Sequence, residues 1–327
     1  MNEAAQTSSR ATTVKPLGDF MTVAMLLSPS LDPDQTRDAP SEVWHYTNAG
    51  GAAGIIGKRE LWATDGLFMN DSSELQVVHR DFTRALKSRA SEHFISDSER
   101  KLLLSAFERA LSSFREDPGI FVVCFCESGD LLSQWQSYGR AGGGYALGFE
   151  SAALAGYDKA VIGNLDFFKV VYDRADQIEA VAEFCVRAFY QLELFLAGSD
   201  EEEREPALEK TGRVLALMAQ WYSARVKDAA FREEQEWRFI CRNPTAPGRP
   251  ATYARQFRVT DRGLIPFVPL QLGQIGRDTA PDAGFPLKRV IVGPTASAEL
   301  AARAMNYLLK DNGFEVQAEV SSIPLRR

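Results

Sequence analysis

The segment Ile120–Cys126 constrains the fold more than any other part of the chain. It is apolar throughout, and turn-forming residues flank it at Asp117–Gly119 and Glu127–Asp130. An apolar run without alternation is typical of a strand that is covered on both faces. The segment therefore predicts a central strand in a sheet that is packed on both sides.

Other segments predict a mixed α and β architecture. Two long segments, Asp176–Ala197 and Glu201–Lys227, are expected to form helices joined by the turn at 198–200. Shorter strands are expected at 43–46, 61–64, 145–150, 167–172, 237–241, 257–259, 263–270, 287–293 and 314–320. We therefore expect one α+β domain over residues 41–327, with a helical insertion at about 175–230. Residues 1–40 are rich in Ser, Thr, Ala, Asp and Pro and are expected to form a disordered or loosely docked tail.

Composition excludes several classes of protein. The net charge of -7 argues against a broad electrostatic grip on nucleic acid or acidic lipid. The 4 cysteines are too few for a disulfide framework, so we expect a reducing, cytoplasmic setting. The 3 histidines lack metal-ligand spacing, and no apolar segment is long enough to cross a bilayer. We expect neither a metal centre nor a membrane anchor.

The motif E-Q-E-W-R at 234–238 is the strongest candidate for chemistry. If it is extended, Glu234 and Glu236 point to the same face, and Arg238 is next on that face. Paired carboxylates beside an arginine suit general base catalysis or the stabilisation of a developing cation. The same pattern also fits a surface ion-pair patch at the end of a strand.

A series of short motifs resembles a widespread bacterial family of unknown function. The motifs are W-H-Y-T (44–47), G-K-R-E-L-W-A-T (57–64), N-D-S-S-E (70–74), C-F-C-E (124–127), W-Q-S-Y-G (135–139), E-Q-E-W-R (234–238), V-I-V-G-P (290–294) and S-S-I-P-L-R (321–326). Each motif is weak alone, and their common order over residues 43–327 is what carries the resemblance.

More distantly, the chain resembles the ADP-ribosyltransferase superfamily. That fold is a split β-sheet around an NAD cleft, with a His on an early strand, an aromatic or serine-bearing middle strand, and a catalytic Glu on a late strand. His45 with Thr47 matches the early strand, and Glu236 with Glu234 matches the late one. The middle element stays open between Tyr138, Tyr145 and the strand Cys124–Cys126.

The resemblance implies a role for each matching residue. Glu236 would hydrogen-bond the nicotinamide ribose and stabilise the oxocarbenium-like charge, and Glu234 would position or deprotonate the acceptor. His45 would contact the ribose hydroxyls or the nicotinamide amide, and Tyr138 or Tyr145 would stack on the nicotinamide ring. The other residues that we expect at the NAD site are Tyr46, Thr47, Asn70, Trp135 and Arg238.

These observations lead us to expect an enzyme that consumes NAD. It would be an ADP-ribosyltransferase or NAD glycohydrolase with a macromolecular acceptor, either protein or nucleic acid, and would serve as a toxin, effector or phage-defence component. One alternative is a non-enzymatic ligand-binding or sensor module on the same fold. A weaker alternative is a metal-dependent nuclease that uses Asp71, Glu74, Glu234 and Glu236.

Overall fold

A computed structural model describes most of the chain beyond the N-terminal segment. The described residues are 39–69, 73–89, 96–114, 119–138, 143–160, 165–242, 254–260, 263–272 and 284–324. Of the tail expected at 1–40, only the last two residues belong to this part. Asn70 and Asp71 lie outside the described residues.

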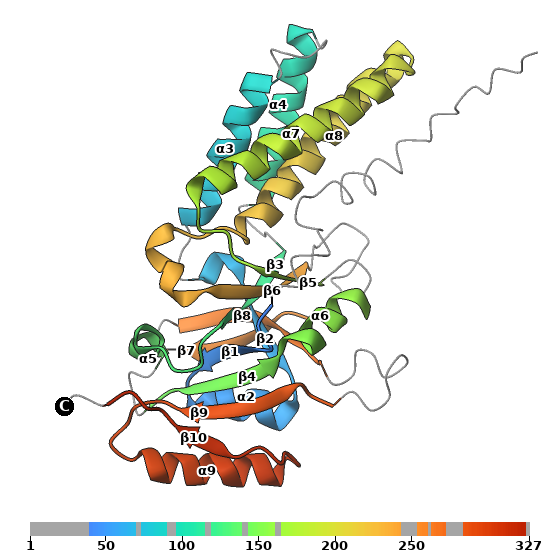
Figure 1. The fold of residues 1–327 in the computed structure, drawn as a ribbon. Coiled ribbons are helices and arrows are strands. Elements are labelled where there is room, and N and C mark those ends of the chain that lie inside the picture. The colour runs from blue at the N-terminus through green and yellow to red at the C-terminus, as the bar shows by residue number, and fades with distance from the viewer. Residues whose placement is uncertain are drawn as a thin grey trace, which may run out of the picture.

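A large, mostly antiparallel sheet forms the body of the protein (Figure 1). Its strands are β1 (Glu42–Thr47), β2 (Leu61–Asp65), β3 (Ile120–Cys126), β4 (Tyr145–Glu150), β5 (Leu165–Lys169), β6 (Glu236–Arg242), β7 (Gln256–Thr260), β8 (Gly263–Leu270), β9 (Leu287–Val292) and β10 (Ala318–Val320). The main path runs β10-β9-β4-β1-β3-β2-β8-β7, and β6 joins β3 to β5. Of these pairings, only that of β9 with β10 is parallel.

The prediction of a central strand at Ile120–Cys126 is confirmed by β3. Every residue of β3 pairs with β6 along one edge. Along the other edge, β1 pairs only through Trp44 opposite Cys126, whereas β2 pairs through Thr64 and Asp65 at the opposite end of β3. Between these two pairings, residues 123–125 have no strand partner on that edge in the described part of the chain. The sheet therefore divides at β3.

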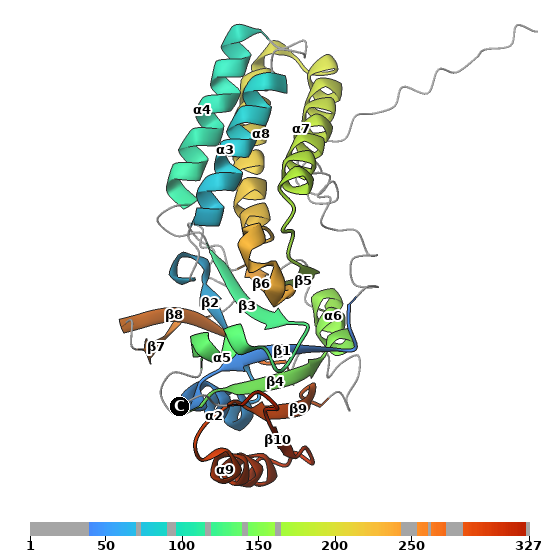
Figure 2. The same ribbon diagram turned by 60° about the vertical axis from the view of Figure 1, so that its left-hand side comes forward.

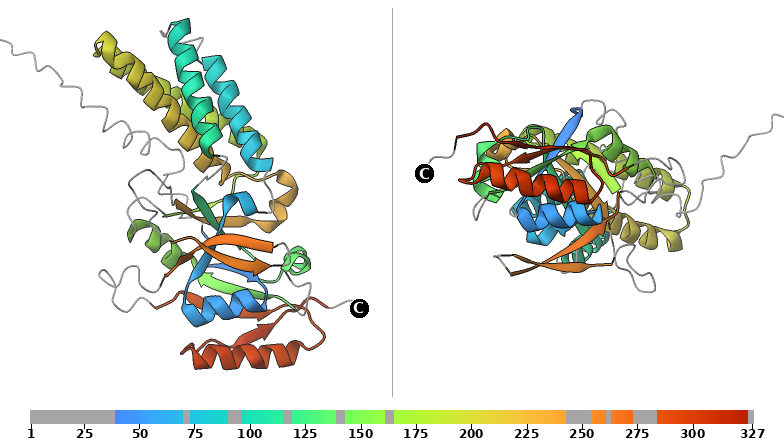
Figure 3. Two further views of the ribbon diagram at one scale, coloured as in Figure 1. Left: turned by 180° about the vertical axis from the view of Figure 1, so that it is seen from behind. Right: turned by 90° about the horizontal axis from the view of Figure 1, so that it is seen from below.

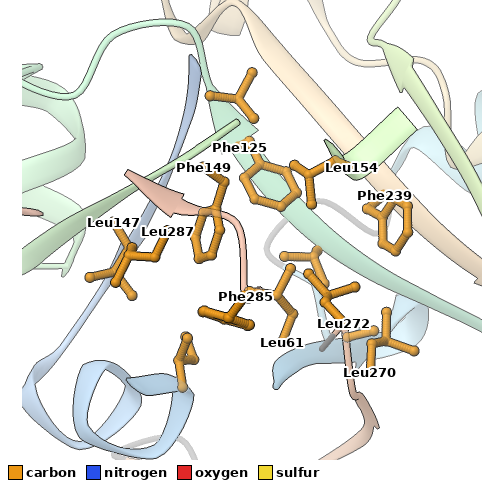
Figure 4. Close-up of a cluster of buried hydrophobic side chains, with 14 of the residues drawn as sticks. Leu61, Phe125, Leu147, Phe149, Leu154, Phe239, Leu270, Leu272, Phe285 and Leu287 are labelled. Carbon is orange, nitrogen blue, oxygen red and sulfur yellow. The ribbon is translucent and has the colours of Figure 1, made fainter. Parts of the chain in front are cut away.

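The apolar face of the sheet is covered by helices and irregular segments. Its core combines side chains from several strands with Leu154 and Phe285, as Figure 4 shows. Phe125 lies at the centre of this core, edge-on to both Phe149 and Phe167. The covering helices include α2 (Ala49–Lys58), α6 (Ser151–Ala160) and α9 (Ala298–Asp311). Figure 3 shows α9 beside α2, with which it is in contact.

Four helices form a bundle at the end of the sheet where β5 and β6 lie (Figure 2). They are α3 (Ser73–Arg89), α4 (Asp97–Phe114), α7 (Arg174–Ala197) and α8 (Glu201–Ser223). The predicted hairpin is confirmed by α7 and α8, but α3 and α4 pack against it around a second apolar core. The bundle is thus assembled from two segments distant in sequence. A short helix, α5 (Leu132–Tyr138), follows β3 and lies beside β1 (Figure 2).

Candidate functional site

The chain after α8 carries the two glutamates into the sheet by an unexpected path. Glu234 ends a 3-10 helix, η4 (Ala229–Glu234), and Gln235 adopts a left-handed conformation with φ of 42°. The prediction that Glu234 and Glu236 alternate along one strand was therefore wrong, because β6 begins only at Glu236. The turn nevertheless brings both carboxylates to one ammonium group. Lys227 Nζ lies 2.6 Å from Glu234 Oε2 and 2.9 Å from Glu236 Oε2.

Glu236 is a buried, fully paired carboxylate. Arg238 donates from Nε to Oε1 at 2.9 Å and from Nη2 to Oε2 at 3.2 Å. The thiol of Cys124 makes a further hydrogen bond to the same carboxylate. Burial alone would raise the pKa of Glu236, but the charges of Arg238 and Lys227 outweigh it and lower the pKa to about 2. Glu236 is therefore ionised at neutral pH although its side chain is 2% exposed.

The base of the helical bundle holds this cluster in place. Arg238 Nη1 donates to the carbonyl oxygen of Ala224, the residue that caps the end of α8, at 2.8 Å. The backbone N–H of Glu236 donates to the hydroxyl oxygen of Tyr172, which follows β5, at 2.9 Å. These bonds satisfy polar groups that would be costly to bury unpaired. The orientation of Glu236 is thus tied to the end of α8.

Three neighbouring strands align the predicted site elements. Cys126 on β3 lies opposite Trp44 on β1 and opposite Glu236 on β6, so these three residues form one row across the sheet. His45 is one residue out of that row, and its ring contacts Phe125 in the apolar core at a centroid distance of 5.9 Å. Its Nδ1 lies 2.9 Å from the carbonyl oxygen of Cys124, in the stretch of β3 that β1 and β2 leave without a strand partner. His45 therefore fills the split in the sheet.

The hydrogen bond of His45 defines its chemistry. A carbonyl oxygen accepts only, so Nδ1 carries the proton and Nε2 is left as an acceptor. Burial lowers the pKa of His45 to about 4, and the nearby charge of Arg258 contributes to this shift. At neutral pH, the imidazole is uncharged and offers a lone pair to a hydroxyl or amide group.

Tyr138, at the end of α5, lies within electrostatic range of the carboxylate cluster. Its side chain is 40% exposed at the end of the helix. Desolvation raises the pKa of its phenol, and the charges of Glu236 and Glu234 raise it further. Of the three middle elements predicted, the strand Cys124–Cys126 pairs with β6 at Glu236, and Tyr138 is near enough for the charge of Glu236 to act on its phenol. Tyr145 lies on β4, which β1 separates from β3, and it packs against the sheet core.

The remaining predicted residues make contacts within the protein. The Tyr46 hydroxyl donates to the Ser128 carbonyl and accepts from the N–H of Leu131, each at 2.9 Å. Trp135 packs edge-on against Tyr46 and donates from Nε1 to Asp130 at 2.7 Å. These contacts fix α5, and hence Tyr138, against β1.

Thr47 lies at the end of β1, opposite Tyr145. Arg238 is the predicted residue in direct contact with Glu236, as its position two residues along the strand implies. Asn70 lies outside the described residues.

Sequence reasoning missed Lys227, Tyr172 and Arg258. Lys227 and Tyr172 are distant in sequence from each other but both contact Glu236. Arg258 on β7 donates from Nη2 to Thr64 Oγ1 on β2 at 2.7 Å. None of the three stands in a recognisable motif. An isolated bridge between Val171 and Val226 brings Tyr172 and Lys227 together, and the pairing of β7 with β8 places Arg258 in the sheet.

Neither a metal site nor a membrane span is found in the described part of the chain. Among those residues, no three His, Cys, Asp or Glu side chains are grouped so that they could hold a metal ion. No helix in the same residues is sufficiently long and apolar to cross a bilayer. Asp71 lies outside the described residues, so the nuclease cluster stays a prediction.

Comparison with known proteins gives one match. Residues 134–239 match a family model described as protein of unknown function (DUF2971). The match begins in α5 and ends in β6, so it includes Tyr138, Lys227 and Glu236 and leaves out His45 and Arg258. It supports the resemblance to a family of unknown function over this part of the chain. No curated protein and no solved structure shows significant similarity.

Proposed function

We propose that the protein cleaves NAD and transfers the ADP-ribosyl group to a macromolecular acceptor or to water. The observation that carries this proposal is the ionised, buried Glu236 on a strand beside β3, with His45 in the split on its other edge. The resemblance to ADP-ribosyltransferases implies that the early, middle and late strands, here β1, β3 and β6, lie side by side. The α+β fold, with a sheet that divides at β3, also supports the proposed NAD cleavage.

The proposed reaction breaks the N-glycosidic bond of NAD. Nicotinamide leaves with the bonding electron pair, and positive charge develops on the ribose. The acceptor oxygen or nitrogen then bonds to the anomeric carbon and gives up its proton. A carboxylate that stays ionised in a water-poor site stabilises the developing cation. Glu236 meets this requirement, since its lowered pKa keeps it charged.

The substrate needs a free acceptor position on Glu236. A carboxylate has about four lone-pair positions. Arg238 takes two of them, and Lys227 and the Cys124 thiol take one each. The thiol is the weakest of these donors. We infer that a ribose hydroxyl replaces the Cys124 thiol while Arg238 and Lys227 keep their contacts.

Two further side chains complete the proposed site. Tyr138 interacts electrostatically with Glu236, and we propose that its ring stacks on the nicotinamide. His45 presents Nε2 as an acceptor for a ribose hydroxyl or the carboxamide N–H. Glu234, which shares Lys227 with Glu236, is placed to orient the acceptor or take its proton. These roles are part of the proposal.

Nicotinamide release measured by mass spectrometry tests the proposal. The purified chain, Glu236→Gln and the control Glu233→Gln are incubated with NAD, with and without cell lysate. Glu233 is an exposed neighbour on η4, so its variant changes the charge equally without touching the cluster. We expect release by the wild type and Glu233→Gln and a loss of at least about 100-fold in Glu236→Gln, the scale of removing a stabilising group. A requirement for lysate, abolished by nuclease or by protease, identifies the acceptor class.

A ligand-binding module is the second candidate. The specific observation in its favour is that every acceptor position of Glu236 is already occupied, which is typical of a structural ion pair. If the folded wild type binds NAD but releases no nicotinamide in any lysate, the binding module replaces the enzyme. Release that is equal in the wild type and Glu236→Gln would also refute the assigned role of Glu236.

A further inference from the structure

Arg258 is a half-buried cation without a carboxylate partner in the described part of the chain. In that part of the chain it donates a hydrogen bond to Thr64 and lies over the Phe267 ring, 5.9 Å from the centroid. Two buried arginines form ion pairs instead, Arg238 with Glu236 and Arg242 with Asp166. A cation that is partly desolvated without a counterion is costly, and it offers strong attraction to an incoming anion.

The sheet connects Arg258 to β3 through β8 and β2. On β7, Arg258 pairs with Ile265 of β8, and β8 pairs with β2 through Phe267 and Thr64. Thr64 in turn pairs with Val122 of β3. Paired residues on antiparallel strands point to the same face, so Arg258 and Thr64 share the face that carries Cys126 and Glu236.

Arg258 also interacts electrostatically with two residues of the proposed site, His45 and Tyr138. Its charge contributes to the lowered pKa of His45, and it interacts electrostatically with Tyr138. Tyr138 in turn interacts with Glu236. Arg258 and Glu236 therefore both act electrostatically on Tyr138.

The chemistry of this pair of residues suits a phosphate. A guanidinium presents a planar fork of donors that matches two phosphate oxygens. Thr64 accepts from Arg258, which leaves the hydroxyl proton of Thr64 free to point at the same anion. The bond to Thr64 also fixes the fork in place, which lowers the entropic cost of binding.

We propose that Arg258 and Thr64 bind the diphosphate of a nucleotide ligand. The identity of that nucleotide as NAD rests on the proposed function, whereas the diphosphate site does not. The net charge of -7 disfavours a nucleic acid as the ligand, because a protein that binds nucleic acid usually attracts its phosphates with an excess of basic residues.

Equilibrium binding by isothermal titration calorimetry tests this site without any turnover. The probes are ADP-ribose, inorganic pyrophosphate, adenosine and a single-stranded oligonucleotide, each titrated into the full chain. The variants are Arg258→Met, Arg258→Lys and Thr64→Val. Arg289→Met is the matched control, since it removes the same charge from a surface pair with Glu319. Thermal melting confirms that each variant is folded.

The expected pattern is specific to a diphosphate. The wild type and Arg289→Met bind ADP-ribose more tightly than adenosine, and Arg258→Met weakens ADP-ribose by at least about tenfold without changing adenosine. Arg258→Lys restores part of the loss, and higher salt weakens ADP-ribose binding only where Arg258 is present.

Three results would overturn the inference: no binding of ADP-ribose or pyrophosphate by the folded wild type, ADP-ribose binding unchanged in Arg258→Met, or Arg258-dependent binding of the oligonucleotide alone. Absence of nicotinamide release would leave this test intact, so the two proposals fail separately.

Discussion

Replacing Glu236 by Gln should reveal a pH-dependent contribution to stability. The amide resembles the protonated carboxyl in size, so the variant mimics a Glu236 that has lost its charge. The pKa of Glu236 is lowered in the folded protein from 4.5 to about 2. A shift of this size corresponds to about 3 kcal/mol of folding free energy. Because the folded pKa is the lower one, this stabilisation is present above about pH 4.5 and disappears as the pH falls towards 2.

Urea unfolding from pH 2.5 to 7, followed by circular dichroism and tryptophan fluorescence, measures the effect. We expect Glu236→Gln to be less stable than the wild type by about 3 kcal/mol at pH 7 and by much less at pH 2.5. His45 also titrates on unfolding, but both proteins contain it and its contribution cancels in the difference. Glu319→Gln is the control, because its exposed pair with Arg289 should be worth at most about 1 kcal/mol.

Two outcomes would refute this reasoning. A difference that does not change with pH would show that the variant acts by disturbing packing and not through the charge of Glu236. A difference below about 1 kcal/mol at pH 7 would show that Arg238 and Lys227 do little more than offset the desolvation of the carboxylate.

Two further predictions concern the helical bundle and the histidine. A Cβ on Gly212 in α8 would lie 2.7 Å from the carbonyl oxygen of Leu103 in α4. Gly212→Ala should therefore lower the free energy of unfolding, measured in urea, by about 1–3 kcal/mol. Gly156→Ala in α6 is the control and should not destabilise the protein, because a Cβ there would meet open space. Equal effects of the two variants would contradict the close packing of α4 on α8. Because the pKa of His45 is about 4, its imidazole resonances should stay unchanged in NMR spectra between pH 5.5 and 8. A midpoint near 6.5 would show that His45 is not buried in the split.

The elements of the fold were largely predictable because their signals are local. The apolar run of β3 and the periodicity of α7 and α8 are properties of consecutive residues, and the structure confirms all three. What the sequence did not reveal was that α3 and α4 complete the bundle, because the choice of partner helix depends on packing between distant segments.

The site was predictable in part for the same reason. The contact of Arg238 with Glu236 follows from strand alternation, and it is present. The link between Glu234 and Glu236 runs instead through Lys227 after a left-handed Gln235. A non-glycine residue adopts that conformation only when surrounding contacts impose it. Local sequence preferences therefore predicted an extended strand through Gln235, where the structure has a turn that brings Glu234 and Glu236 to Lys227.

A crystal structure with a non-cleavable NAD analogue tests the central claim most directly. We predict that the nicotinamide ribose lies within hydrogen-bond distance of Glu236, with the nicotinamide ring beside Tyr138 and the diphosphate beside Arg258. The Cys124 thiol should have moved away from the carboxylate. An analogue bound elsewhere on the protein, or no binding by the folded chain, would contradict the assignment of this split sheet as an NAD site.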